Sequence, residues 1–195
     1  MIQAILCVSF TFGRAATGFA GEPLEQLRQT TDKVLSVLAD QALKGSAKTR
    51  ERRERIQKIV DERFDWEEMA RRSLARHWAQ RTPEEKREFI PLFKELLERV
   101  YADKVEGYSW NKILYEGEHT DGNYAAVKVK ITTAKDQAIH VEYRIWKKGN
   151  DWLVYDFSVE GVGLVNNYRT QFNEIILKSS FQELIKRLKA KSAQN

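Results

Sequence analysis

The sequence is poor in the residues on which much enzyme chemistry depends. It has a single cysteine, Cys7, and three histidines among 195 residues. Cys7 stands within the first twenty residues, so the rest of the chain offers no thiol for a disulfide, a nucleophile or a zinc site. The histidines pair neither with each other nor with carboxylates at a spacing typical of metal ligands. We therefore expect no metal ion, no cofactor and no thiol chemistry.

Sequence motifs of several enzyme classes are also missing. The chain has no glycine-rich phosphate loop and no Gly-x-Ser-x-Gly elbow. Asp156 has one catalytic interpretation: it follows Tyr155 in an apolar strand, where burial would raise its pKa, so the pair could act in a small cone-shaped enzyme pocket. The alternative is a structural carboxylate bonded to nearby backbone or to Arg144 on an adjacent strand. We favour the structural role and expect no catalytic residues, because the sequence shows no second polar group that would converge on Asp156.

Neither sign of charge is in strong excess. The chain has 33 Lys and Arg residues against 28 Asp and Glu. The two signs are closely mixed, as in KTRERRERIQKIVDER at residues 48–63. Such mixing is typical of solvated helix faces rather than of a stripe that binds a polyanion. We therefore expect no nucleic-acid partner.

Residues 1–20, MIQAILCVSFTFGRAATGFA, differ from the rest of the chain. Their apolar run is too short for a stable membrane anchor, and Gly18 and Ala20 supply the small side chains that a signal peptidase reads. We predict a signal peptide over 1–20, followed by a single domain over 21–195. No Lys or Arg precedes the apolar run, which leaves a buried N-terminal strand or helix as the alternative.

Hydrophobic residues recur with a helical period in several segments. The expected helices cover 23–43, 49–63, 65–78, 83–108 and 165–190, the last one broken near Ser179. Asp65 and Thr82 are predicted N-caps. Pro91 is expected to kink or interrupt its helix.

Between residues 113 and 159 the period changes to two. Alternating apolar and polar residues predict strands over 113–118, 123–133, 138–147 and 151–159, joined by turns rich in Gly, Asn and Asp. This order of elements indicates an α+β fold: a four-stranded antiparallel curved sheet with helices packed on its apolar face. Such a layer can be packed solid or can enclose a cavity.

Two segments resemble a known family. They are DWEEMARRSLARHWAQRTPEEKREFIPLFKELLERVYADKVEGY at 65–108 and VEYRIWKKGNDWLVYDFSVEGVGLVNNYRTQF at 141–172. Both are similar to the periplasmic phospholipid-binding family called MlaC, also known as the toluene-tolerance family. The similarity extends from about residue 24 to 188, and it is most specific in the segment WLVYDFSVEGVGLVNNYRTQF. One departure is Ala75, which stands where the family commonly has glycine.

The resemblance implies a periplasmic phospholipid carrier that is not an enzyme. It would shuttle glycerophospholipid between an outer-membrane lipoprotein–porin complex and an inner-membrane MCE-type ABC transporter complex, and so maintain the lipid asymmetry of the outer membrane. The phospholipid would be cargo, held in an apolar cavity by a monomer. The alternatives are a carrier of a hopanoid-related lipid, the small enzyme described above, or an adaptor that binds partners and no lipid.

Candidate lining residues are those on apolar faces near the sheet. They are Phe89, Phe93, Leu97, Tyr101, Val127, Val129, Val141, Tyr143, Tyr155, Phe157, Val165, Tyr168 and Phe172. Arg144 and Arg169 are the candidates for contact with the lipid head group at the cavity rim.

Overall fold

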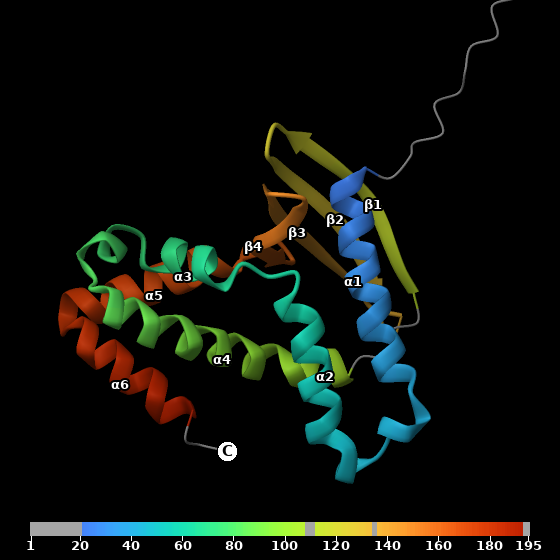
Figure 1. Cartoon of the computed structure of the whole chain (residues 1–195), viewed down its shortest axis with the longest axis horizontal. Helices are drawn as coiled ribbons and strands as arrows, with labels where there is room; N and C mark the ends of the chain where they lie inside the picture. The colour runs from blue at the N-terminus through green and yellow to red at the C-terminus, as the bar shows by residue number, and fades with distance from the viewer. Residues whose placement is uncertain (1–20, 108–111, 134–135, 193–195) are drawn as a thin grey trace, which may run out of the picture.

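The computed structural model describes residues 21–107, 112–133 and 136–192, so the predicted signal peptide at 1–20 lies outside the described residues. Six α-helices occur in the described ranges: α1 (Glu22–Ala39), α2 (Thr49–Asp61), α3 (Trp66–Leu74), α4 (Pro83–Gly107), α5 (Leu164–Lys178) and α6 (Phe181–Ser192). Figure 1 shows a sheet covered by α1, with α3 to α6 gathered in a lobe beside it.

The sheet is an antiparallel meander in the order β1-β2-β3-β4-β5. Its strands are β1 (Lys112–Asp121), β2 (Tyr124–Thr132), β3 (Ala138–Lys148), β4 (Asp151–Val159) and β5 (Val162–Gly163). The four long strands confirm the expected meander, and the two-residue β5 is added to it. A bulge between Tyr115 and Gly117 interrupts the pairing of β1 with β2.

The apolar face of the sheet packs against α1. Val127 of β2 and Ile145 of β3 are buried together with Leu24 and Leu27 of α1. The backbone N–H of Leu24 also donates to Glu118 Oε2 of β1 at 2.9 Å. This bond satisfies one of the free N–H groups in the first turn of α1 and fixes that turn against the sheet.

A second cluster of buried residues lies between α3, α4, α5 and α6. Its centre is aromatic: the rings of Phe89 and Phe93 lie 5.7 Å apart, and Phe172 meets Phe93 at 5.6 Å. Phe64 and Phe157 pack against both this cluster and the one beneath α1. These two rings therefore connect the helical lobe to the sheet.

The helices begin where their capping residues predict. Asp65 accepts a hydrogen bond from the N–H of Glu68 at 3.1 Å, and Thr82 accepts one from the N–H of Glu85 at 3.2 Å. Of the two outcomes expected at Pro91, a kink or a break, the break is wrong, because α4 continues through Pro91 as one helix. Packing of the long apolar face of α4 outweighs the hydrogen bond that proline cannot donate.

Ala75 ends α3 in an unusual conformation. Its φ is 47° and its ψ is −121°, a region that side chains with a Cβ rarely adopt. The resemblance described above implies glycine at this position, and the backbone geometry here suits glycine although alanine occupies it.

Candidate functional site

A cavity of ≈ 760 Å³ lies between the apolar face of the sheet and helices α1, α2 and α4. Most of its lining is apolar: Leu27, Val34, Ile56, Val60, Phe64, Trp66, Leu97, Tyr101, Ile113, Val129, Ile131, Ile139, Val141, Tyr143, Phe157 and Val159. The polar lining residues are Thr30, Thr31, Arg53, Gln57, Glu95, Glu98, Arg99, Gln137 and Glu160. Its size falls within the range of about 300–1,000 Å³ common for ligand sites.

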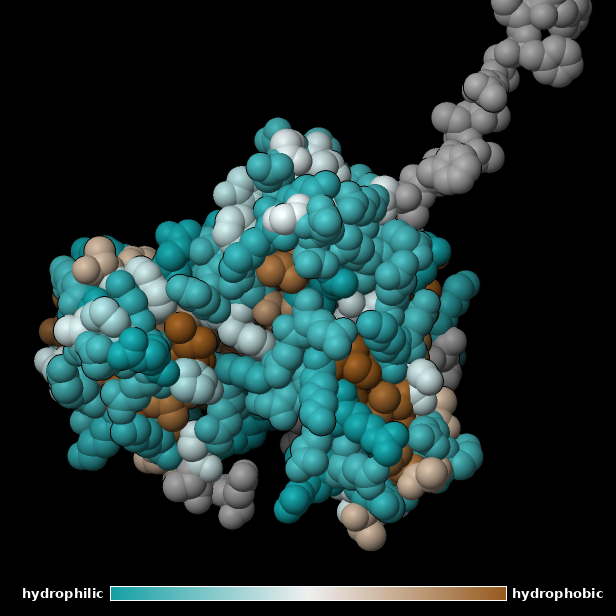
Figure 2. All heavy atoms as spheres, in the orientation of Figure 1, coloured by the Kyte–Doolittle hydropathy of each residue, from teal (hydrophilic) through white to brown (hydrophobic). Residues whose placement is uncertain are grey.

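Helix α2 forms a thin wall of this cavity. None of its residues, all of which the structure describes, is fully buried. Its apolar stripe, with Ile56 and Val60, faces the cavity instead of a packed core. Figure 2 shows apolar atoms along the line where α1 and α2 meet, and a hollow between α2 and the lobe of α4 and α6.

Three aromatic side chains shape the opposite wall. The ring of Phe157 on β4 meets Tyr101 of α4 edge-on at 5.2 Å and lies 6.1 Å from Tyr143 of β3. Burial raises the pKa of Tyr143 to about 12, so its hydroxyl stays neutral. The cavity wall therefore carries no charge in this region.

Polar side chains bridge α2 and α4 beside the cavity. Gln57 donates to Glu98 Oε2 at 3.0 Å, and Lys94 approaches Asp61 Oδ2 at 2.6 Å. Trp66 at the start of α3 donates from its indole Nε1 to Asp61 at 2.8 Å. Burial raises the pKa of Glu98 above its ordinary value. We call the pairs Gln57–Glu98 and Asp61–Lys94 the α2–α4 bridge.

The structure brings part of the predicted lining set together around the cavity. These residues are Leu97, Tyr101, Val129, Val141, Tyr143 and Phe157. Contact between them and a lipid stays a prediction.

The other predicted lining residues lie elsewhere. Phe89, Phe93, Val165, Tyr168 and Phe172 belong to the aromatic cluster of the helical lobe. Val127 is fully buried in the cluster beneath α1, and Tyr155 lies under the Arg72 guanidinium at the outer side of the sheet.

The two predicted rim arginines also lie away from the cavity. Arg144 is exposed on β3, where it approaches Glu142 at 3.6 Å. Arg169 donates to the carbonyl oxygen of Arg72 at 3.1 Å. The arginines that line the cavity are Arg53 of α2 and Arg99 of α4.

Sequence reasoning missed the contributions of α1 and α2 to the cavity. The available signal was the thin apolar line of Ile56 and Val60 on an otherwise charged helix. Such a narrow stripe cannot bury a helix in a solid core, but it suffices for one side of a cavity.

Asp156 has a structural position. It is buried, and its Oδ1 accepts a hydrogen bond from the N–H of Val165 at 3.0 Å in the first turn of α5. The bond supplies an acceptor where a helix has unpaired N–H groups and a positive dipole end. Asp156 thereby fixes α5 to the sheet, away from the cavity lining.

Within 21–107, 112–133 and 136–192, no three His, Cys, Asp or Glu side chains form a cluster suited to a metal ion. Over the same residues, no helix has both the length and the apolar character needed to cross a membrane.

Comparison with known sequences gives a consistent result. The family model described as MlaC protein matches residues 28–190. The intermembrane phospholipid transport system binding protein MlaC of Haemophilus influenzae is 29% identical over 126 residues, which are 62% of this chain and 59% of that protein. The toluene tolerance protein ttg2D of Pseudomonas putida is 26% identical over 99 residues, 50% of this chain and 46% of that protein. The matches thus span about half the length of these curated relatives.

A solved structure has the same fold. The phospholipid-binding protein of Ralstonia solanacearum, determined in complex with a phospholipid, matches with a TM-score of 0.78. The match covers 89% of this chain and 98% of that chain at 24% sequence identity. The similarity establishes the α+β architecture predicted from the sequence.

Proposed function

The chain belongs to the MlaC family, and on this premise we propose that it is a periplasmic carrier of glycerophospholipid. The observation that supports this most strongly is the cavity of ≈ 760 Å³ with its largely apolar lining. The names of the relatives in Haemophilus influenzae and Ralstonia solanacearum, which refer to phospholipid transport and phospholipid binding, agree with it.

The energetics of lipid tails favour an enclosed cavity. Burial of one methylene is worth about 0.8 kcal/mol, so two tails of about fifteen methylenes each would cost on the order of 20 kcal/mol if left in water. A shallow groove cannot shield that much surface. The same cost makes spontaneous extraction from a bilayer slow, so we expect transfer while the carrier is docked on a partner.

The finer assignments form part of the proposal. The partners would be an outer-membrane lipoprotein–porin complex and an inner-membrane MCE-type ABC transporter complex, and transfer between them would maintain outer-membrane lipid asymmetry. The protein would act as a monomer and would not be an enzyme. Asp156 supports the last point, since it serves the first turn of α5 rather than a reaction site.

Native mass spectrometry of protein purified from the periplasm without detergent tests the proposal, followed by lipid extraction. We expect an added mass equal to one phospholipid, which is released on denaturation. A polycyclic lipid in the extract would instead support the hopanoid-related alternative. A bare protein mass that persists after incubation with phospholipid vesicles and a membrane partner would refute a carrier function.

A further inference from the structure

A cluster of arginines around Tyr155 lies outside the cavity. We call it the arginine–tyrosine surface, and it consists of Arg71, Arg72, Arg76, Arg144, Tyr155 and Arg169. These residues come from α3, from the short 3-10 helix (Ala75–Gln80) that follows it, and from β3, β4 and α5, and all of them lie outside the cavity lining. Four of the five arginines are exposed. Retention of lipid tails therefore does not explain them.

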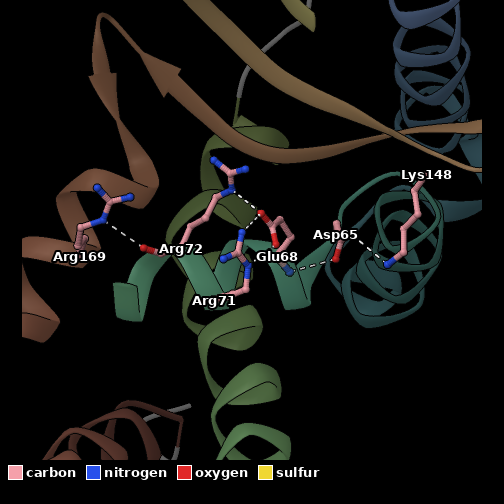
Figure 3. A network of polar contacts seen from close by, with 6 residues as sticks. All are labelled: Asp65, Glu68, Arg71, Arg72, Lys148 and Arg169. Carbon is pink, nitrogen blue, oxygen red and sulfur yellow. Dashed lines mark hydrogen bonds and ion pairs between the residues drawn. The ribbon is translucent and has the colours of Figure 1, made fainter. Parts of the chain in front are cut away.

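The centre of this surface is a guanidinium held from two sides. The Arg72 guanidinium lies 4.0 Å from the centre of the Tyr155 ring, and its Nε donates to Glu68 Oε1 at 2.6 Å. Glu68 also accepts two hydrogen bonds of 2.6 Å from Arg71. Figure 3 shows Glu68 between the two guanidinium groups. Both arginines are thus fixed in place, while Arg71 keeps 50% and Arg72 28% of its side chain exposed.

Glu68 remains charged in this arrangement. Burial pushes the pKa of Glu68 upward, but hydrogen bonds from Arg71 and Arg72 outweigh it, so the pKa is lowered. One buried carboxylate therefore orients two arginines and neutralises the charge of only one.

Two more arginines add charge, and among the described residues neither is paired with a carboxylate. Arg76 donates to Asn173 Oδ1 at 2.9 Å, and Arg169 donates to the carbonyl oxygen of Arg72 at 3.1 Å. Both acceptors are neutral, so these contacts orient the arginines without neutralising them. Figure 3 shows Arg169 extending from α5 toward α3.

The remaining arginine borders the aromatic centre. Arg144 is 55% exposed and approaches Glu142 at 3.6 Å, which is a weak exposed pair. Tyr124 also borders the centre: it is 47% exposed and its ring meets that of Tyr155 edge-on at 6.0 Å. The result is a positively charged surface with oriented arginines around an aromatic centre.

We propose that this surface docks an acidic face of a partner protein. Arg and Tyr dominate the energetic centres of protein–protein interfaces. Guanidinium groups already held in place lose little rotamer entropy when they pair with fixed carboxylates. Membrane surfaces are bound instead by Lys and Arg accompanied by large apolar side chains that enter the bilayer, and the arginine–tyrosine surface contains no Leu, Ile, Phe or Trp. The inference rests on the proposed function, in that the partner would be a donor or acceptor of the lipid.

The position of the surface suits a docked transfer. Its two central arginines, Arg71 and Arg72, lie on α3, which begins at Trp66. Trp66 lines the cavity and donates to Asp61 at the end of α2. A partner bound to α3 would therefore lie close to the end of α2, the helix that forms the thin wall of the cavity.

The test uses two double variants with equal changes in charge. Arg76→Glu with Arg144→Glu reverses two exposed positions of the surface. The control, Arg87→Glu with Arg187→Glu, reverses exposed arginines of α4 and α6, which pair with Glu84 and Glu183 respectively. Binding of each full-length protein is measured to three probes: the purified lipoprotein–porin complex, the purified MCE-type complex, and vesicles of phosphatidylethanolamine and phosphatidylglycerol. Lipid content is measured separately by native mass spectrometry.

We expect the surface variant to bind at least one of the two complexes roughly tenfold or more weakly, with unchanged lipid content. Wild-type affinity should fall with salt, and the control should bind as wild type does. Equal affinities of both variants, no binding of wild type to either complex, or a loss confined to the vesicles would overturn the inference. If the surface variant loses binding to the complexes although the purified proteins carry no lipid, the docking surface is confirmed and the carrier function is refuted.

Discussion

At the scale of residues, Val127 and Val129 show how sharply the environment changes along one strand. They are two positions apart on β2, so both side chains point to the same face of the sheet. Both belong to the cluster beneath α1, but Val127 is fully buried there, whereas Val129 also lines the cavity. A larger side chain should therefore reduce lipid binding at one position and destabilise the fold at the other.

We predict that Val129→Trp reduces bound lipid while the protein stays folded, because the indole occupies cavity space. Val127→Trp should instead destabilise the protein by about 1–3 kcal/mol, because that site is already filled. Lipid per folded molecule and urea unfolding measure the two effects, and Val141→Trp repeats the first at a second lining position. Full lipid loading of both cavity variants would contradict the prediction.

A second prediction at this scale concerns Ala75. Its positive φ stores backbone strain of about 1–3 kcal/mol. Ala75→Gly should relieve that strain, partly offset by the greater entropy of the unfolded chain, about 0.4–1 kcal/mol. We expect a net gain of about 1 kcal/mol in urea unfolding. Ala79→Gly, later in the 3-10 helix Ala75–Gln80, is the matched control and should destabilise the protein. A loss of stability in both variants would count against strain at Ala75.

At the scale of elements, Asp156 links α5 to the sheet through the N–H of Val165. Asp156→Ala removes the acceptor and should cost about 0.5–2 kcal/mol, whereas Asp156→Asn keeps an acceptor oxygen and should recover much of it. Both variants should retain lipid, because Asp156 lies outside the cavity lining. Loss of lipid from the stable Asn variant would reveal a role beyond helix capping.

The α2–α4 bridge should respond to pH through Glu98. Because burial raises the pKa of Glu98 in the folded protein, the stability it contributes is complete below the unfolded pKa of about 4.3 and is lost as pH rises through the folded value. The stability of Glu98→Gln relative to wild type should therefore increase over that rise in pH. Urea unfolding across the acid range checks this, with Glu54→Gln, an exposed carboxylate paired with Arg50, as control. Parallel curves for wild type and Glu98→Gln would rule it out.

The helices and strands could be predicted from the sequence because they depend on local periodicity. The four long strands and the break between α5 and α6 lie close to the positions that alternation and helical spacing predicted. The cavity could not be predicted from the sequence in the same way. Phe93 and Tyr101 share the apolar face of α4, yet one is in solid packing and the other lines the cavity. Periodicity tells which face turns inward, whereas the choice between filled and hollow depends on distant elements such as α2.

At the scale of the whole molecule, cargo and stability should be coupled. A lipid that binds only the folded state stabilises it by mass action, by about 2.7 kcal/mol at a hundred times the dissociation constant. For a chain of this size, that corresponds to roughly 5–10 °C in the melting temperature. Protein stripped of lipid and refolded should therefore melt lower than protein purified with its cargo, and added phospholipid should restore the difference. Equal melting curves in calorimetry would show that the cavity contributes no such coupling.

The bulge in β1 has a consequence for contacts between molecules. A regular sheet edge offers free N–H and C=O groups to a strand from another molecule. On one side of this sheet, the bulge between Tyr115 and Gly117 breaks that regular row. Beside β4, the N–H of Val154 donates to the carbonyl oxygen of Arg63 at 2.8 Å, and the carbonyl oxygen of Val154 accepts from the N–H of Asp65 at 2.9 Å. Neither side thus provides a continuous template for strand addition, which disfavours pairing of this sheet with a strand from another molecule.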